Sequence, residues 1–363
     1  MALDPDIQGM LTLLETVGRP DLSAGTPEEA RRALRMITVD VRPLHSVVAV
    51  GEVDEVTIPA GSGRGRLRLR RYRPAGRRSV LRPTLVFFHG GGFVMGDLDT
   101  HDNQCRRLCH ELDAVVVSVE YRLAPEHPFP AAVEDAMAAT RWVADRLARL
   151  GGDPDRFAVA GDSAGGNLAT GVAQAWPDEV AAGRPALAAQ LLLYPVVDLV
   201  DDDGERYPSR AEYAEIGLLT GDELRWFGDH YVGDREFETP SSPASPPTFT
   251  SPDDRGAGDQ PVDVLEGDVV DRRDPRLSPL YGRLEGLPPS LIVTAEVDPL
   301  RDEGEVYAAA LRDAGVEVEF HRFEGLIHGF FDMAAISVTS AEAVATTCRR
   351  FRELLDRRSA VTG

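Results

Sequence analysis

Residues 156–169 read Arg-Phe-Ala-Val-Ala-Gly-Asp-Ser-Ala-Gly-Gly-Asn-Leu-Ala, an apolar run that breaks at Gly161 and then resumes as helix-forming sequence. This order predicts a strand, a tight turn and a helix, with Ser163 at the apex of the turn. Gly161 and Gly165 stand two residues on either side of the serine, where the two backbones pass too close for a Cβ atom. The stretch therefore predicts an exposed serine hydroxyl on a strained turn.

Two other interpretations of this turn remain open from the stretch alone. Ser163 could simply cap the following helix, a position that serine often fills. A phosphate-binding glycine loop also joins a strand to a helix, but it needs Gly-Lys-Ser/Thr, and all 39 positive side chains of this chain are arginine. The absence of lysine also excludes Schiff-base chemistry and a Ser-Lys dyad. Residues elsewhere in the chain must decide between a nucleophile and a cap.

The length is long for one domain but within the range of a large α/β enzyme, and the composition is that of ordinary soluble globular proteins. The chain has 363 residues, of which 43% are hydrophobic and 27% charged, and no apolar run reaches the roughly 18 residues of a membrane span. Residues 1–18 lack the basic start and long apolar core of a signal peptide, so we expect a cytoplasmic protein. The net charge of −21 argues against nucleic acid and anionic membrane surfaces as partners.

The three cysteines, Cys105, Cys109 and Cys348, are too few and too unevenly spaced for a disulfide framework. Cys105 and Cys109 lie four residues apart on a predicted helix, but no further ligands complete a zinc signature. We expect buried free thiols, no metal and no cofactor.

Apolar runs alternate with helix-like sequence through most of the chain. The alternating pattern of residues 53–58 and 67–72 predicts an antiparallel hairpin around Gly61-Ser62-Gly63. Residues 316–323 also alternate, which predicts an edge strand that could pair in a homodimer. Continuous apolar runs predict strands buried on both faces, and hence a parallel centre of the sheet, at 84–88, 114–119, 157–160, 190–193 and 291–295.

The remaining segments differ in composition from this alternating core, whose two parts are residues 51–200 and 275–363. Residues 1–50 hold amphipathic helical patterns before any strand, and we expect them to form an N-terminal helical cap segment. Residues 201–233 contain a second, aromatic-rich cap helix pattern. Residues 234–274 are acidic and rich in proline and serine, which predicts a mobile insertion.

Residues 89–97, His-Gly-Gly-Gly-Phe-Val-Met-Gly-Asp, follow the predicted strand at 84–88. A glycine triplet at the carboxyl end of a buried strand leaves backbone N–H groups uncovered, at the edge where open α/β sheets bind ligands. Such donors can hold a negative charge that develops during a reaction. A flexible turn is the alternative, although a turn seldom needs three consecutive glycines.

Asp298 and His328 lie beyond the ends of the last two predicted strands. Asp298 could accept a hydrogen bond from an imidazole or cap the next helix, and Asp302 could do the same one turn later. His328 stands in the loop Gly-Leu-Ile-His-Gly-Phe, and among histidines near strand ends it alone follows both Ser163 and Asp298. The chain order is therefore serine, acid, histidine, the order of an α/β-hydrolase triad.

Taken together, these motifs resemble those of the hormone-sensitive-lipase-like esterases, the group IV bacterial carboxylesterases. The resemblance spans about residues 84–331 and includes Tyr-Arg-Leu-Ala-Pro-Glu at 121–126 and Asp-Pro-Arg-Leu-Ser-Pro at 274–279. It implies an α/β-hydrolase fold, with a mostly parallel eight-stranded sheet flanked by helices and an α-helical cap. The sequence departs from the family at 234–274, which is much shorter in the relatives.

The resemblance also implies a role for each matching residue. Ser163 is the expected nucleophile, His328 the general base and acid, and Asp298 the carboxylate that holds the imidazole. The oxyanion N–H groups that it implies belong to Gly91, Gly92 and Ala164.

Apolar residues near the predicted site suit a small neutral ester of short or medium chain as substrate. An amidase or a deacetylase of a secondary metabolite would use the same three side chains and is the alternative function. A pure ligand receptor would be expected to lack the histidine, and a lyase or cyclase would form product without taking oxygen from water. The candidates for an apolar acyl pocket are Phe93, Val94, Met95, Leu218, Leu219 and Trp226.

Overall fold

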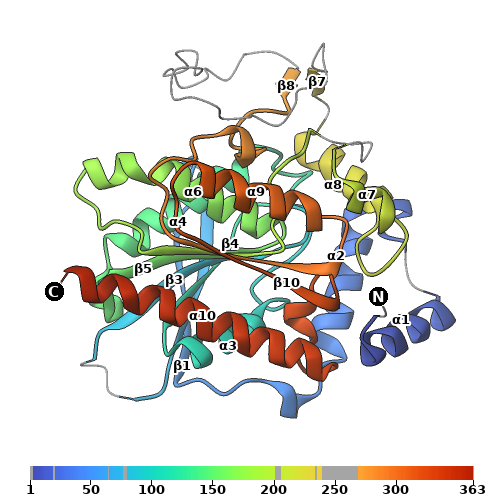
Figure 1. Ribbon diagram of the computed structural model, residues 1–363, viewed down its shortest axis with the longest axis horizontal. Coiled ribbons are helices and arrows are strands. Elements are labelled where there is room, and N and C mark those ends of the chain that lie inside the picture. The colour runs from blue at the N-terminus through green and yellow to red at the C-terminus, as the bar shows by residue number, and fades with distance from the viewer. Residues whose placement is uncertain are drawn as a thin grey trace.

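One eight-stranded sheet forms the centre of the molecule, with helices on both of its faces (Figure 1). The strand order is β1-β2-β4-β3-β5-β6-β9-β10. The computed structural model describes residues 3–18, 21–63, 65–76, 80–200, 206–233, 235–238 and 269–362.

The sheet is mostly parallel, as predicted. β1 pairs antiparallel with β2 and β2 antiparallel with β4, whereas every other neighbouring pair is parallel. β10 lies at one edge, which confirms the predicted edge strand, while pairing between subunits stays a prediction. The strands are β1 (Glu52–Pro59), β2 (Arg66–Arg73), β3 (Arg82–Phe88), β4 (Val115–Glu120), β5 (Gly152–Asp162), β6 (Ala189–Leu193), β9 (Ser290–Val297) and β10 (Val318–Ile327).

Two apolar clusters fill the layers between the sheet and the helices. Alternate residues of β3 separate into them: Val86 and Phe88 face one cluster, and Leu85 and Phe87 face the other. The first layer is covered by α4 (Ala131–Ala144), α5 (Leu147–Leu150), α6 (Ala164–Ala181) and α9 (Arg301–Asp313), and the second by α3 (Asp102–Leu112) and α10 (Val338–Thr362). All three cysteines are buried free thiols.

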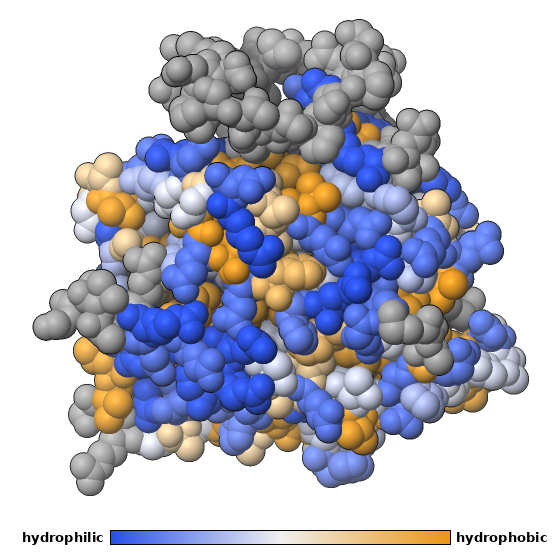
Figure 2. Space-filling view, viewed as in Figure 1, coloured by the Kyte–Doolittle hydropathy of each residue, from blue (hydrophilic) through white to orange (hydrophobic). Residues whose placement is uncertain are grey.

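Hydrophilic side chains dominate the face of the molecule shown in Figure 2, around a narrower band of apolar atoms. This distribution agrees with the high content of charged residues, 27% of the chain. Among the helices of the described residues, none is both long enough and apolar enough to cross a membrane.

The turn between β5 and α6 has the close contacts that the sequence predicts. A Cβ atom on Gly161 would lie 2.1 Å from the carbonyl oxygen of Gly165, and one on Gly165 would lie 1.9 Å from that of Phe88. Ser163 has φ 54° and ψ −120°, a conformation that L residues rarely adopt. Although Ser163 precedes α6 at the N-cap position, its side chain makes no capping hydrogen bond. The capping interpretation is therefore wrong.

Two chain segments form an α-helical cap on the side where the parallel strands end (Figure 1). The two segments are far apart in sequence, but α8 (Gly221–Val232) of the second packs against η1 (Leu22–Ala24) of the first. The first segment holds α1 (Pro5–Val17), η1 (Leu22–Ala24), α2 (Pro27–Arg35), the π-helical turn η2 (Met36–Asp40) and η3 (Leu44–Ser46). The second holds α7 (Pro208–Glu212) and α8 (Gly221–Val232).

Side chains of the cap explain how α2 begins and how the cap is held to the core of the protein. Thr26 and Glu29 form a capping box at the start of α2, as the Thr-Pro-Glu-Glu sequence indicates. Arg31 of α2 donates to the carbonyl oxygens of Val94 and Ala124, both at 2.8 Å. It also forms an ion pair with Glu126 at 2.7 Å. These bonds hold the cap to the loops that follow β3 and β4.

The predicted insertion at 234–274 is described only at its two ends. β7 (Glu236–Glu238) and β8 (Val269–Asp271) pair in parallel as a separate two-stranded sheet. Residue 234 and residues 239–268 lie outside the described residues. Two short turns complete the described chain, η5 (Pro279–Tyr281) and η6 (Phe330–Met333).

Two glycines of α6 provide a matched test of the turn. A Cβ atom on Gly165 would collide with the backbone of β3, whereas one on Gly171 would meet no heavy atom within 4 Å. We expect Gly165→Ala to lower the free energy of unfolding by about 3 kcal/mol, because the clash is with backbone. Gly171→Ala should raise it by about 0.5–1 kcal/mol, because alanine favours the helix. Urea unfolding measures both, and similar changes in the two variants would contradict the close contact.

Candidate active site

Ser163, His328 and Asp298 meet beyond the carboxyl ends of β5, β10 and β9. His328 Nε2 lies 3.0 Å from Ser163 Oγ, and His328 Nδ1 lies 2.8 Å from Asp298 Oδ2. Both distances are those of hydrogen bonds. The structure therefore brings together all three side chains that the sequence analysis selects. Asp302 takes no part in the hydrogen bonds that connect Ser163, His328 and Asp298.

Each of the three side chains is held by its surroundings. The Asp298 side chain is fully buried, and its Oδ1 accepts a hydrogen bond from the N–H of Leu300 at 2.8 Å, which leaves Oδ2 for the imidazole. The His328 ring packs edge-on against Tyr194, with ring centroids 4.7 Å apart. The strained backbone of Ser163 directs its hydroxyl toward His328 rather than toward α6.

The pKa of His328 reflects two opposing effects. Burial lowers this pKa, but the charge of Asp298 and the hydrogen bond to it raise it, and the net result lies above the ordinary value of 6.5. Because Asp298 accepts a hydrogen bond from Nδ1–H, the neutral imidazole keeps an unprotonated Nε2 toward Ser163. Nε2 can therefore accept the proton of the serine hydroxyl.

Backbone N–H groups gather beside Ser163. Gly91 and Gly92 have φ of 107° and 59°, and a Cβ atom on Gly92 would lie 2.2 Å from the ring of Phe227. Neither glycine donates a backbone hydrogen bond to another described residue. Ala164 is the first residue of α6, so its N–H has no acceptor within the helix. These donors remain available to a bound group.

A buried polar network supports the loop after β3 that contains Gly90, Gly91 and Gly92, here called the glycine loop. The sequence analysis did not identify this network. Asp162 Oδ1 accepts the N–H of Gly90 at 2.8 Å, and Asp162 Oδ2 lies 3.6 Å from His101 Nε2. The hydroxyl of Tyr121 donates to the carbonyl oxygen of His89 at 2.7 Å, and the two rings stack. The position of Asp162 directly before Ser163 was the available sequence signal.

A family model described as alpha/beta hydrolase fold matches residues 85–270 and 260–332. The chain belongs to this family. It is 37% identical over 358 residues to the carboxylic ester hydrolase LipN of Mycobacterium tuberculosis, covering 98% of this chain and 84% of LipN. It is 33% identical to an ethyl acetate hydrolase of Pseudomonas putida, covering 98% and 100% of the two chains.

Other relatives extend the comparison. The arylacetamide deacetylase of Oryctolagus cuniculus is 34% identical and covers 72% of this chain, which covers 71% of it. The structure of a hyperthermophilic esterase from the archaeon Pyrobaculum calidifontis superposes with a TM-score of 0.78 at 37% identity, covering 98% and 99% of the two chains. These matches confirm the predicted α/β-hydrolase fold and the resemblance to hormone-sensitive-lipase-like esterases.

A cavity of about 520 Å³ opens over Ser163 and His328. The cap supplies much of the cavity wall, through α1, α2 and α8. The segments that follow the strands of the sheet supply the rest, so the sheet and the cap form the site together. Of the six predicted pocket residues, four line this cavity: Phe93, Met95, Leu218 and Leu219.

The prediction is wrong for the other two pocket residues, Val94 and Trp226, because neither lines the cavity. Val94 is completely buried in the core, and its carbonyl oxygen binds Arg31. The Trp226 ring packs against His230, with centroids 4.2 Å apart. On α8, Leu224 and Phe227 face the cavity instead, and their three-residue spacing on one helix face was the signal that the sequence offered.

The cavity wall also has a polar part. His101, Gln104 and Arg107 of the region around α3 line it together with Asp332, which follows His328 by four residues. The buried amide of Gln104 has no hydrogen-bond partner among the described residues. The polar part of the wall is therefore formed by the region around α3 together with Asp332.

Asp298 should control the pKa of His328, and Asp302 should not. We expect this pKa to lie above 6.5 in the wild type and to fall in Asp298→Asn, since the neutral amide no longer attracts the imidazolium and burial then dominates. Asp302 accepts the N–H of Ser209 at 2.7 Å and pairs with Arg301, so Asp302→Asn should leave the value nearly unchanged. Imidazole NMR titration measures all three proteins, and an unchanged pKa in Asp298→Asn would contradict the geometry.

Proposed function

We propose that the protein is a serine carboxylesterase that hydrolyses short- to medium-chain neutral esters through an acyl-enzyme on Ser163. The observation that carries the proposal is the hydrogen-bonded series from Ser163 Oγ through His328 to Asp298. Two relatives support ester hydrolysis as the reaction: one named a carboxylic ester hydrolase, at 37% identity, and one named an ethyl acetate hydrolase, at 33%, both over nearly the whole chain.

Acylation begins when His328 Nε2 accepts the Ser163 proton as Oγ attacks the ester carbonyl carbon. The negative charge then moves to the carbonyl oxygen. The N–H groups of Gly91, Gly92 and Ala164 are the proposed donors to this oxyanion, and each such donor typically contributes about 3 kcal/mol. His328 next gives its proton to the alcohol oxygen, which leaves as the tetrahedral intermediate collapses.

Deacylation repeats these steps with water in place of the serine. His328 takes a proton from water, which attacks the acyl carbon, and then returns that proton to Ser163 Oγ as the acid departs. Asp298 stays ionised, orients the ring and stabilises the imidazolium in both halves of the reaction. The scheme uses only groups of this chain and needs no cofactor.

The lining of the cavity supports a neutral acyl group. Phe93, Met95, Leu219, Leu224 and Phe227 contribute apolar surface close to Ser163. A largely apolar pocket with a few placed polar groups is what a small uncharged ligand requires.

Replacement of the nucleophile tests the mechanism directly. We expect Ser163→Ala to lower kcat for p-nitrophenyl butyrate roughly 10⁴- to 10⁶-fold, because the covalent step is lost. A fluorophosphonate should label the wild-type protein, and peptide mapping should place the label on Ser163. Hydrolysis at the wild-type rate by Ser163→Ala, or labelling at another residue, would refute the mechanism.

Amide hydrolysis is the second candidate function, because one relative is named an arylacetamide deacetylase. The same three side chains could cleave an amide, but His328 would then have to protonate a poorer leaving group. We expect kcat/KM for p-nitrophenyl acetate to exceed that for p-nitroacetanilide by far, since the two differ only in the atom that leaves. A higher value for the anilide would favour the amidase.

A further inference from the structure

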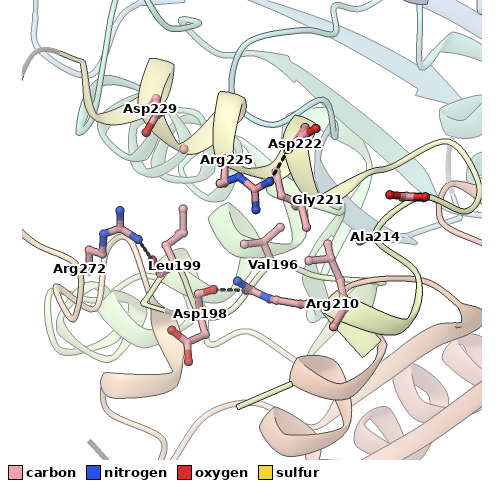
Figure 3. A pocket seen from close by; sticks show the side chains of 15 residues that line it. Val196, Asp198, Leu199, Arg210, Ala214, Gly221, Asp222, Arg225, Asp229 and Arg272 are labelled. Atoms are coloured by element: carbon pink, nitrogen blue, oxygen red, sulfur yellow. Dashed lines mark hydrogen bonds and ion pairs between the residues drawn. The ribbon is translucent and has the colours of Figure 1, made fainter. Parts of the chain in front are cut away.

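A second cavity of about 340 Å³ lies beside the active-site cavity, with α8 on one side and the segment after β6 on the other (Figure 3). It contains neither Ser163 nor His328. The residues that line both cavities are Val196, Leu199, Leu224 and Gly228. The two cavities therefore share one wall, which is built by the segment after β6 and by α8.

Apolar atoms make up the larger part of the inner surface of the second cavity, although seven of its fifteen lining residues are charged. Val196 and Leu199 project into it from below in Figure 3, and Ala214 lies at its side. Ala211, Leu224 and Leu300 complete this apolar lining. A volume of this size is at the lower end of the range of pockets that bind small molecules.

Most of the charged groups around the cavity already have protein partners. Arg225 pairs with Asp222, and Arg272 donates to the carbonyl oxygen of Leu199 at 3.2 Å. Figure 3 shows both contacts along the border of the cavity. Arg210 donates to Glu303 and to the carbonyl oxygen of Asp198, at 2.5 and 2.6 Å. An apolar chain could therefore enter without separating these charges.

The direction of the substrate follows from the proposed chemistry. His328 must protonate the leaving alcohol, so the alcohol part lies near His328 and the segment that follows it, residues 329–336. The rest of the cavity is lined by residues 10–46, 91–107 and 196–228, and we place the acyl part along the last of these three segments. The shared wall stands at that acyl end.

The backbone of the shared wall is fixed, whereas its side chains leave space. The N–H of Val197 donates to Glu303 Oε1 and that of Leu199 to Ser278 Oγ, both at 2.8 Å. Leu199 and Leu224 are only partly buried. A Cβ atom on Gly228 would meet no heavy atom within 4 Å. The side chains of Val196, Leu199 and Leu224 therefore separate the cavities, and the two leucines are the less buried of the three.

We propose that Leu199 and Leu224 limit the acyl-chain length of the substrate by closing the acyl end of the active-site cavity, and that the second cavity is the space into which the distal methylenes of a longer linear acyl chain extend once this wall is opened. This inference rests on the proposed esterase function. It assigns a role to a cavity that the mechanism itself does not use.

The inference is tested by truncating the two leucine side chains of the shared wall. The ratio of kcat/KM for p-nitrophenyl decanoate to that for p-nitrophenyl butyrate is compared between the wild type and Leu199→Ala/Leu224→Ala. We expect the ratio to rise about 10-fold or more, since each methylene newly buried in an apolar site is worth about a four-fold gain. Leu34→Ala is the matched control, because Leu34 lines only the active-site cavity, and it should not raise the ratio. An unchanged ratio in the double variant overturns the inference.

A third substitution locates the extra chain. Ala214 lines only the second cavity, so Ala214→Phe added to the double variant should fill that space and return the ratio to the wild-type value. A ratio that stays high would show that the chain lies elsewhere and would also overturn the inference. If circular dichroism shows that the double variant is unfolded, the two single variants are measured in the same way.

Failure of the inference and failure of the proposed function give different results. A wild-type protein that hydrolyses butyrate and is labelled at Ser163, with a ratio insensitive to the wall, overturns only the role of Leu199 and Leu224. A wild-type protein that neither hydrolyses these esters nor reacts with a fluorophosphonate overturns the esterase function itself.

Discussion

The contact of backbone with backbone where β5 turns into α6 is the constraint on which the site depends. Gly161 and Gly165 allow the strand, the helix and β3 to approach at distances that leave no room for a Cβ atom. The turn must then be tight, and Ser163 takes a left-handed conformation that directs its hydroxyl away from α6. The packing of the central strands thus supports the strained residue on which the chemistry rests.

Two buried carboxylates position the other groups of the site. Asp298 is buried next to His328, and the partly buried imidazole gains more from this carboxylate than it loses by burial. On the other side of Ser163, Asp162 binds the N–H of Gly90 and leaves the next two N–H groups of the loop without backbone acceptors. One buried carboxylate therefore orients the base, and another holds the loop that offers the donors.

The strands, the hairpin and the mostly parallel sheet could be predicted because each depends on local periodicity and on burial of both faces. The meeting of Ser163, Asp298 and His328 could also be anticipated, since each follows a strand and the carboxyl ends of parallel strands share one edge. Cap residues were harder to predict. Trp226 is the more conspicuous side chain, but Leu224 and Phe227 face the cavity, because the rotation of α8 is set by what it packs against.

The sequence alone determined the order serine, acid, histidine, the glycines of the turn and the absence of lysine, because these are properties of residue type and spacing. Tertiary structure decided which side chains line the active-site cavity, how His101 and Asp162 support the loop after β3, and that Val196, Leu199 and Leu224 line both this cavity and the second one. Those features arise from contacts between segments far apart in the chain. Their geometry depends on how the cap rests on the sheet, which no local pattern specifies.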